Sequence, residues 1–522
     1  MSGRLLYTND LKISKDDFLS ALALMEHGGP DVPLCYTEYG TSKLGHNRLS
    51  ILDADPRSNQ PFISADGRYA IVYSGEVYNY KDLAREHDII MRTNSDTEVV
   101  LELSIKIGFG SALKHFNGMF AYVIYEIKSG DYFAARDRLG IKPLYIYDNG
   151  DDIILSSEIN AIVQLLGGKV DIDHIGKRQY KRLRGFYNGS TIYKDIKMLP
   201  AGHCIKDGKT SQWWKLPFGE KEPPSDEELR SLIDNAISCR MIVDVPIGAL
   251  VSGGLDSTII AAIAAKKYNN ELCTWTAGIH GDEEFNELLY GRIAAKTIGS
   301  CHHEVTVYKE RFLQTAKEII KIRKEPLSFT SDIIQYELSR EIGKSTKVVL
   351  CGEGSDELFF GYDRICKWAE SRGSFDIRDF SLAYTHGAAD DDIEIVESVM
   401  KPFYEYKRPI DIVSAFLQTS KFEVICRRLD FSSMLCGIET RSPFMDHRLV
   451  ERLFAVPLDW KMKDGVLKAP LKRIYRDVVP EKIIKRQKTG MSEPAPLEGI
   501  LGVSKDKAFD AWIEFNLSQL AL

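Results

Sequence analysis

The chain has 522 residues, of which 44% are hydrophobic and 27% charged, and this composition is typical of a globular protein. Its length exceeds what one hydrophobic core usually organises, so we expect at least two domains. The formal net charge of −7 argues against nucleic acid or an anionic membrane surface as the main partner. The sequence has no run of 18 apolar residues and its first ten residues lack a signal-peptide core, so we expect no membrane span.

The nine cysteines are dispersed along the chain and form no Cys-x-x-Cys pair. An odd, scattered set in a long chain is typical of reduced thiols, so we expect a cytoplasmic protein. For the same reason the sequence argues against a structural zinc site.

Residues 1 to about 200 are predicted to be rich in strands. Runs of β-branched and aromatic residues at 69–73 and 120–125 predict two of these strands. The turn residues 128–131 and the following apolar run, which ends at Arg136, predict a hairpin with the second strand. Helical patterns at 15–26 and 96–107 suggest sheets with helices packed outside them.

Residues 213–228 contain three prolines among charged residues and are predicted to be an exposed linker, which divides the chain into domains at 1–212 and 226–522. Beyond it, apolar runs that end near Val251, Ile279 and Cys351 alternate with helical patterns. This alternation predicts a parallel, doubly wound α/β sheet. Such sheets bind ligands beyond the carboxyl ends of their strands, which would place Ser252, Ala277 and Gly352 at one rim.

The segment Ser252-Gly253-Gly254-Leu255-Asp256-Ser257 separates an apolar run from the helical pattern 258–267. Glycines allow the backbone N–H groups to approach a ligand, and the helix N-terminus adds unpaired donors, so the segment predicts a phosphate site. The Gly-Lys-Ser/Thr of a Walker loop is missing. A carboxylate beside phosphates is tolerable mainly with Mg²⁺ between them. An ordinary glycine turn is the alternative.

A second loop, Gly352-Glu353-Gly354-Ser355-Asp356-Glu357, carries three carboxylates in five residues. Clustered carboxylates repel one another unless a cation accompanies them. A solvated acidic turn would explain the composition alone. The position directly after an apolar run favours a binding site.

Together these loops resemble those of the asparagine synthetase family, and the resemblance extends from about Gly28 to Pro494. It implies an N-terminal αββα sandwich of the Ntn-type (class II) glutamine amidotransferases and a C-terminal doubly wound synthetase domain of the ATP-pyrophosphatase type. It also implies a reaction in which Mg²⁺ and ATP activate a carboxylate, aspartate by default, as an acyl-adenylate. Ammonia or glutamine nitrogen would then displace AMP and form an amide.

The resemblance also implies roles for individual residues of the second domain. Asp256 and Asp356 would hold Mg²⁺, Glu353 would act as the general base or orient the nitrogen nucleophile, and Lys468 would stabilise charge on the α-phosphate. The resemblance implies the same electrostatic role for Lys488, on a weaker motif match. The implied contacts to ATP and pyrophosphate are Leu250, Ser252, Gly253, Gly254, Asp256, Ser257, Ala277, Cys351, Gly352 and Asp356.

The family pattern continues in Gly437–Asp446, around the acceptor pocket. Just before it, Phe431 stands where a cation is common, and this departure leaves the acceptor open.

In the first domain Arg48 would pair with the glutamine α-carboxylate, and Glu76 and Asp96 would hold its α-ammonium. Two departures concern Ser2 and Ser74, in Ser74-Gly75-Glu76. The family has the nucleophilic cysteine at the first position and an asparagine oxyanion donor at the second. Losing one such donor typically costs about 10²–10³ in rate, and an alkoxide forms less readily than a thiolate. We therefore expect an impaired glutaminase.

Several alternatives stay open at this stage. A working serine nucleophile is one of them, and an engineered substitution would explain Ser2 but not Ser74. Related ligases act on other carboxylates, as in β-lactam cyclisation or the amidation of a uronic acid. A further hypothesis, from a different class of function, is a regulatory protein that binds ATP without catalysis. The expected partners are small molecules, with no nucleic acid and no membrane, and the expected assembly is a homodimer.

Overall fold

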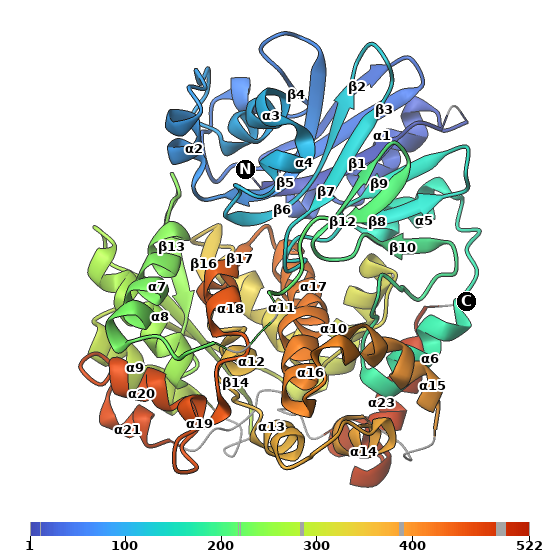
Figure 1. Ribbon diagram of the computed structural model, residues 1–522. Helices are drawn as coiled ribbons and strands as arrows, with labels where there is room; N and C mark the ends of the chain where they lie inside the picture. The colour runs from blue at the N-terminus through green and yellow to red at the C-terminus, as the bar shows by residue number, and fades with distance from the viewer. Residues whose placement is uncertain are drawn as a thin grey trace.

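The computed structural model describes residues 2–10, 12–217, 219, 221–281, 287–385, 391–486 and 497–520. The prediction for Lys488 therefore lies outside the described residues. Figure 1 shows the strand-rich first half of the chain stacked on a second half in which helices surround a smaller sheet. Among the described residues, no helix is long and apolar enough to cross a membrane.

The first half contains two six-stranded sheets whose strand pairs are antiparallel. The first has the order β10-β8-β9-β1-β3-β2, and the second the order β12-β11-β7-β6-β5-β4. Their strands are β1 (Ser2–Thr8), β2 (Val32–Tyr39), β3 (Ser42–Leu49), β4 (Phe62–Ile63), β5 (Tyr69–Val77), β6 (Gly118–Glu126), β7 (Tyr132–Arg136), β8 (Tyr145–Asp148), β9 (Ile153–Ser156), β10 (Ile196–Met198), β11 (His203–Lys206) and β12 (Lys209–Gln212).

Side chains that alternate between the two faces of each strand explain why these sheets stack. In β6, Ala121, Val123 and Tyr125 enter one buried cluster together with Leu5 and Leu155 of the facing sheet. The intervening residues of β6 pack on the other side, under α3. The sheet is therefore buried on both faces, one against the other sheet and one against helices. This arrangement gives four layers, so the αββα sandwich is confirmed. The helices here are α1 (Lys15–Ala23), α2 (Tyr80–Glu86), α3 (Asp96–Ile107), α4 (Phe109–Ala112), α5 (Ile159–Leu165) and α6 (His174–Leu183).

The second half contains one parallel sheet of five strands, as predicted. Its order is β15-β14-β13-β16-β17, so the chain leaves β13 toward one edge and later returns to its other side. Ligand sites form where strand order reverses in this way, which here is the rim beside β13. The strands are β13 (Ile247–Leu250), β14 (Cys273–Ile279), β15 (Cys301–Val307), β16 (Val348–Leu350) and β17 (Glu439–Arg441).

Helices cover this sheet and extend below it (Figure 1). They are α7 (Asp226–Cys239), α8 (Leu255–Lys267), α9 (Leu288–Ile298), α10 (Lys309–Arg323), α11 (Ser331–Ile342), α12 (Ser355–Leu358), α13 (Asp363–Glu370), α14 (Ile377–Tyr384), α15 (Ile393–Met400), α16 (Pro409–Phe416), α17 (Phe422–Met434), α18 (His447–Leu453), α19 (Leu458–Lys461), α20 (Ala469–Ile474), α21 (Glu481–Ile484), α22 (Leu497–Leu501) and α23 (Ala508–Ser518).

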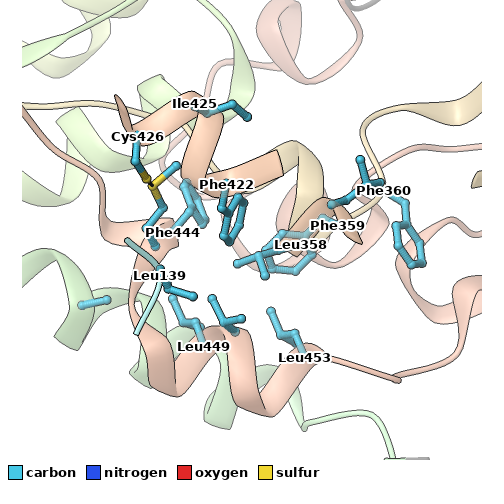
Figure 2. Packing of buried hydrophobic residues seen from close by; sticks show 14 of the residues in the cluster. Leu139, Leu358, Phe359, Phe360, Phe422, Ile425, Cys426, Phe444, Leu449 and Leu453 are labelled. Carbon is cyan, nitrogen blue, oxygen red and sulfur yellow. Dashed lines mark hydrogen bonds between the residues drawn. The ribbon is translucent and has the colours of Figure 1, made fainter. Parts of the chain in front are cut away.

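One hydrophobic cluster crosses the boundary between the two halves. Leu139, from a loop of the first half, packs with residues of α12, α17 and α18, and Figure 2 shows it near Phe444 and Leu449. The predicted linker is also less exposed than expected, because Leu216 is 2% exposed and belongs to this cluster. Trp214 donates a 2.7 Å hydrogen bond to Glu451 of α18. The linker is therefore packed onto the second half along part of its length.

Candidate functional site

A pocket of about 710 Å³ opens at the carboxyl ends of β13, β14 and β16. This is the rim that the sequence predicted for ligand binding. The pocket is lined by all the predicted ATP-contacting residues except Gly253, namely Leu250, Ser252, Gly254, Asp256, Ser257, Ala277, Cys351, Gly352 and Asp356, and by Glu353 and Lys468.

The loop after β13 is held in a shape that only glycine permits at one position. Gly253 has a φ of 68°, and a Cβ there would lie 2.3 Å from the backbone carbon of Tyr290. Gly254 has an ordinary φ and precedes the first residue of α8. The N–H of Ser252 donates to Ser257 Oγ at 3.2 Å, which folds the loop back on the helix start. The first turn of α8 (Leu255, Asp256 and Ser257) lines the pocket, so a helix N-terminus lies beside it, as a phosphate site requires.

Lys468 joins the two predicted metal ligands. Its Nζ contacts Asp256 Oδ2 and lies 2.6 Å from Asp356 Oδ1. Burial alone would lower the pKa of Lys468, but the two carboxylates outweigh it and raise that pKa above its usual value. Two carboxylates from separate loops thus converge on one cation.

This arrangement fits the Mg²⁺ that the resemblance implies. Oxygen ligands from Asp256 and Asp356 already point toward a shared positive charge, and Ser355 Oγ donates to Asp256 Oδ1 at 2.7 Å. Mg²⁺ in nucleotide sites is typically bound by one or two carboxylates together with phosphates. The two carboxylates would hold the ion, with Lys468 shared between them and the phosphates.

Glu353 is held in place by a cation that the sequence did not single out. Arg428 of α17 contacts Glu353 Oε1 at 2.8 Å and Ser331 Oγ at 2.7 Å. The Glu353 carbonyl accepts a hydrogen bond from Ser442 Oγ, which follows β17. Side chain and backbone are therefore both fixed, and the carboxylate lines the pocket beside Cys351.

Three further cations line the pocket and were missed as site residues: Lys472, Lys485 and Arg486. Arg486 donates to the Ser252 carbonyl at 3.3 Å, stacks over the Tyr290 ring and lies 3.8 Å from Glu287. Burial raises the pKa of Glu287 to about 7. Lysines and arginines are common at protein surfaces, so only the fold distinguishes these three from solvated ones.

The side chain of Phe431, which departs from the family pattern, does not line the pocket. Phe431 is 7% exposed, packs in a separate hydrophobic cluster and carries the Arg323 guanidinium 4.8 Å above its ring. Its neighbour Leu429 lines the pocket instead. Phe431 therefore does not line this pocket, because the helical turn of α17 points the two side chains in different directions, and the acceptor stays open.

The predicted glutamine-site residues Arg48, Ser74, Glu76 and Asp96 are all 0% exposed. Arg48 donates to Asn59 Oδ1 and to backbone carbonyls of the loop 52–55. Asp96 Oδ2 accepts from Tyr73 OH at 2.7 Å and from Val77 N at 2.9 Å. The structure brings these residues together but engages each of them with the protein itself.

Ser74 and Glu76 lie on either side of Gly75, whose φ is 145°. Ser74 Oγ donates to the Gly3 carbonyl at 2.7 Å, so this position lies next to the start of β1. Ser2 begins that strand and pairs with Leu49, and its side chain is outside the described part of the structure.

Glu76 Oε2 lies 3.1 Å from Arg441 of β17. Burial and the nearby charge of Asp96 raise the pKa of Glu76 to about 8. A residue of the first half is therefore paired with the sheet of the second.

Comparison with known proteins gives two family matches. Residues 228–510 match the asparagine synthase model and residues 1–214 match a glutamine amidotransferase domain. A putative glutamine-hydrolysing asparagine synthetase of Methanocaldococcus jannaschii is 31% identical over 382 residues, 67% of this chain and 73% of that one. The putative glutamine-hydrolysing asparagine synthetase of Mycobacterium tuberculosis H37Rv is 32% identical over 66% of this chain and 57% of its own length.

Asparagine synthetase 3 of Bacillus subtilis is 28% identical over 91% of this chain and 84% of its own. Among solved structures, an allosteric regulatory enzyme of purine biosynthesis matches 58% of this chain and 80% of its own, with 14% identity and a TM-score of 0.32 that is too low to assign a fold. The synthase match alone spans more than half of the chain. The chain belongs to the asparagine synthetase family of ATP-dependent, amide-forming ligases.

Proposed function

We propose that this chain activates a carboxylate, aspartate by default, as an acyl-adenylate and converts it to an amide with ammonia. The observation that carries the proposal is the bridge of Lys468 between Asp256 and Asp356 inside the pocket. It joins the loop after β13, the loop after β16 and a C-terminal segment around the place where a triphosphate would lie. The family match supports the same reaction class.

In the first step a carboxylate oxygen attacks the α-phosphorus, and the bond to the bridging oxygen breaks with release of pyrophosphate. The loop 252–257 and the start of α8 would bind the leaving pyrophosphate through backbone N–H groups. Lys468 would stabilise the charge that develops on the α-phosphate. Mg²⁺ held by Asp256 and Asp356 would neutralise the pyrophosphate.

In the second step nitrogen attacks the acyl carbon and AMP leaves. Glu353 would take the proton from the attacking nitrogen, and Arg428 would position its carboxylate through the 2.8 Å contact. Carboxylate and guanidinium therefore act as a unit in which only Glu353 touches the reacting atoms.

We propose that the first domain has lost efficient glutamine hydrolysis. Ser2 replaces the expected cysteine, and the Ser74 hydroxyl donates to a backbone carbonyl rather than standing ready as an amide donor. The terminal nitrogens of Arg48 and the Oδ2 of Asp96 already make hydrogen bonds within the protein. Ammonia would then be the nitrogen source.

The proposed domain division at 1–212 and 226–522 is supported by two structural boundaries. Strand β12 ends at Gln212, and α7 begins at Asp226, where the Ser225 side chain accepts a hydrogen bond from Glu228 N as an N-cap. The segment between them carries no helix or strand among the residues that the structure describes.

The test is a screen of carboxylates for pyrophosphate release, with ammonia and with glutamine in parallel. Aspartate and other amino acids, a β-amino acid that can cyclise, and uronic acids cover the alternatives. Phosphorus NMR of the turnover mixture should show AMP and pyrophosphate. ADP and orthophosphate as primary products would contradict the proposal, and ATP binding without turnover on any carboxylate would favour a regulatory role.

A further inference from the structure

Two cysteines and a histidine lie together at the edge of the second-half sheet, outside the nucleotide pocket. Cys273 is the first residue of β14 and Cys301 the first residue of β15, and the two are direct register partners. His303 lies two residues beyond Cys301, so it shares a face with both cysteines. Within the described ranges this is the one group of three ligand-type residues whose ligand atoms lie within 4.8 Å of one another.

The spacing of these atoms agrees with binding to one metal ion. Cys301 Sγ lies 3.5 Å from His303 Nε2. In a tetrahedral zinc site, with Zn–S near 2.3 Å and Zn–N near 2.0 Å, sulfur and nitrogen ligands are about 3.5 Å apart. A metal could therefore take the place between these two atoms with little movement of either side chain.

The histidine ring is already oriented by its neighbour. His303 stacks on Trp275 with ring centroids 5.3 Å apart and an interplanar angle of 21°. Trp275 is 3% exposed and lines the nucleotide pocket on the same strand. His302 points to the opposite face, where its Nδ1 lies 3.0 Å from Thr274 Oγ1. Stacking fixes the plane of His303 and leaves Nε2 directed at the cysteines.

The cluster is accessible from solvent. Cys273 and Cys301 are partly buried and His303 is exposed. Because it lies at the amino ends of β14 and β15, it is separated from the carboxyl-end rim that carries Asp256 and Asp356. An ion could enter here, and water could complete the coordination, without disturbing the Mg²⁺ site.

We propose that Cys273, Cys301 and His303 bind a thiophilic divalent transition metal such as Zn²⁺, with a water molecule as the fourth ligand. Each cysteine loses its proton to solvent on binding, so two thiolates balance the charge of the ion. The sequence did not predict this site, because its two cysteines are 28 positions apart and only the parallel register of β14 and β15 makes them neighbours.

The test uses the reduced full-length chain after treatment with a chelator, titrated with Co²⁺ as a spectroscopic substitute for Zn²⁺. We expect one equivalent to bind with thiolate-to-cobalt charge-transfer absorption and the visible bands of a tetrahedral site, and Zn²⁺ to displace it. Cys273→Ser, Cys301→Ser and His303→Gln should each weaken binding by at least about tenfold. The matched controls His302→Gln and Cys239→Ser should bind as the wild type does.

Thermal unfolding with and without Zn²⁺ shows whether a variant is folded. The wild type should unfold at a higher temperature with Zn²⁺, whereas His303→Gln, which changes an exposed side chain, should match the wild type without metal and gain less than it at the same Zn²⁺ concentration. Co²⁺ absorption without the thiolate band would place the ion elsewhere and overturn the proposal. Unchanged binding by His303→Gln, or a Cys273–Cys301 disulfide that persists in the presence of reductant, would also overturn it.

Discussion

The nucleotide pocket and the first-domain site both contain buried charges, but these charges have different partners. In the pocket, Asp256 and Asp356 share the ammonium of Lys468, a group that a bound phosphate can take over. In the first domain, Glu76 is paired with Arg441 and Asp96 with Tyr73 and the backbone. One set of charges faces a cavity, and the other is enclosed by protein.

The first domain also docks onto the second half through buried ion pairs. Asp430 of α17 forms ion pairs with Arg4 at 2.7 Å and with Lys142 at 2.9 Å, and both of these cations lie in the first half. Lys142 also lies 3.3 Å from Glu439. Breaking a buried ion pair on one side typically costs about 3–5 kcal/mol, so such a network resists separation of the two halves. Buried charges of the first half therefore also hold the two halves together.

The largest effect is expected where the pocket charges converge. Lys468→Ala should lower pyrophosphate release by about 10²–10³, because the α-phosphate loses its electrostatic partner. ATP binding, measured by calorimetry, should persist through the loop 252–257. Lys463→Ala is the control, since Lys463 is exposed in the same segment and does not line the pocket. Near-native turnover of Lys468→Ala would remove this lysine from the mechanism.

Glu353→Gln separates the two chemical steps. Amide formation should fall by about 10², while ATP–pyrophosphate exchange dependent on the carboxylate continues, because proton transfer is needed only after adenylation. The comparison variant is Glu337→Gln, since Glu337 pairs with Arg340 outside the pocket lining. An equal loss of exchange and amide formation would instead give Glu353 a role in adenylation.

The first-domain site is tested by restoring the family residues. The unaltered chain should use ammonia and release little glutamate from glutamine. Ser2→Cys alone should gain little, and Ser2→Cys with Ser74→Asn should exceed the sum of the two single variants, because nucleophile and oxyanion donor act together. Glutamate release is measured for all four proteins. Efficient hydrolysis by the unaltered chain would make Ser2 the nucleophile and refute the loss of function.

The smallest expected effect is on the pH dependence of stability and involves the buried carboxyl group of Glu76. The pKa of Glu76 is about 8 in the folded chain against an ordinary value of 4.5. Between these values the folded state holds a proton that the unfolded chain releases, so this residue's contribution to stability falls as the pH rises toward 8.

Glu76→Gln should therefore flatten the pH dependence of the unfolding midpoint between pH 5 and about 8, and the exposed Glu86→Gln should leave it unchanged. If Glu76→Gln kept the wild-type slope, Glu76 would be ionised throughout that range and available to an α-ammonium.

Several local features could be predicted from the sequence because their causes are local. The predicted helix 96–107 is α3, and the predicted hairpin is formed by β6 and β7. Glycine and serine before α8 marked the turn at 252–254 through turn chemistry, and β-branched runs marked the strands. Strand ends depend on pairing: the strand predicted at 69–73 continues to Val77, because pairing with β6 extends it.

The sequence by itself determined the element pattern, the two loops after β13 and β16, and the replacements at Ser2 and Ser74. Only the tertiary structure decided which charges meet. Arg428 reaches Glu353 across 75 positions, Lys468 reaches Asp256 across 212, and Arg441 reaches Glu76 across 365. Spacing along a chain reports the period of a helix or strand, whereas such pairs depend on strand order and on how two cores pack. The Cys273–Cys301 pair has the same origin, since parallel register alone makes those thiols neighbours.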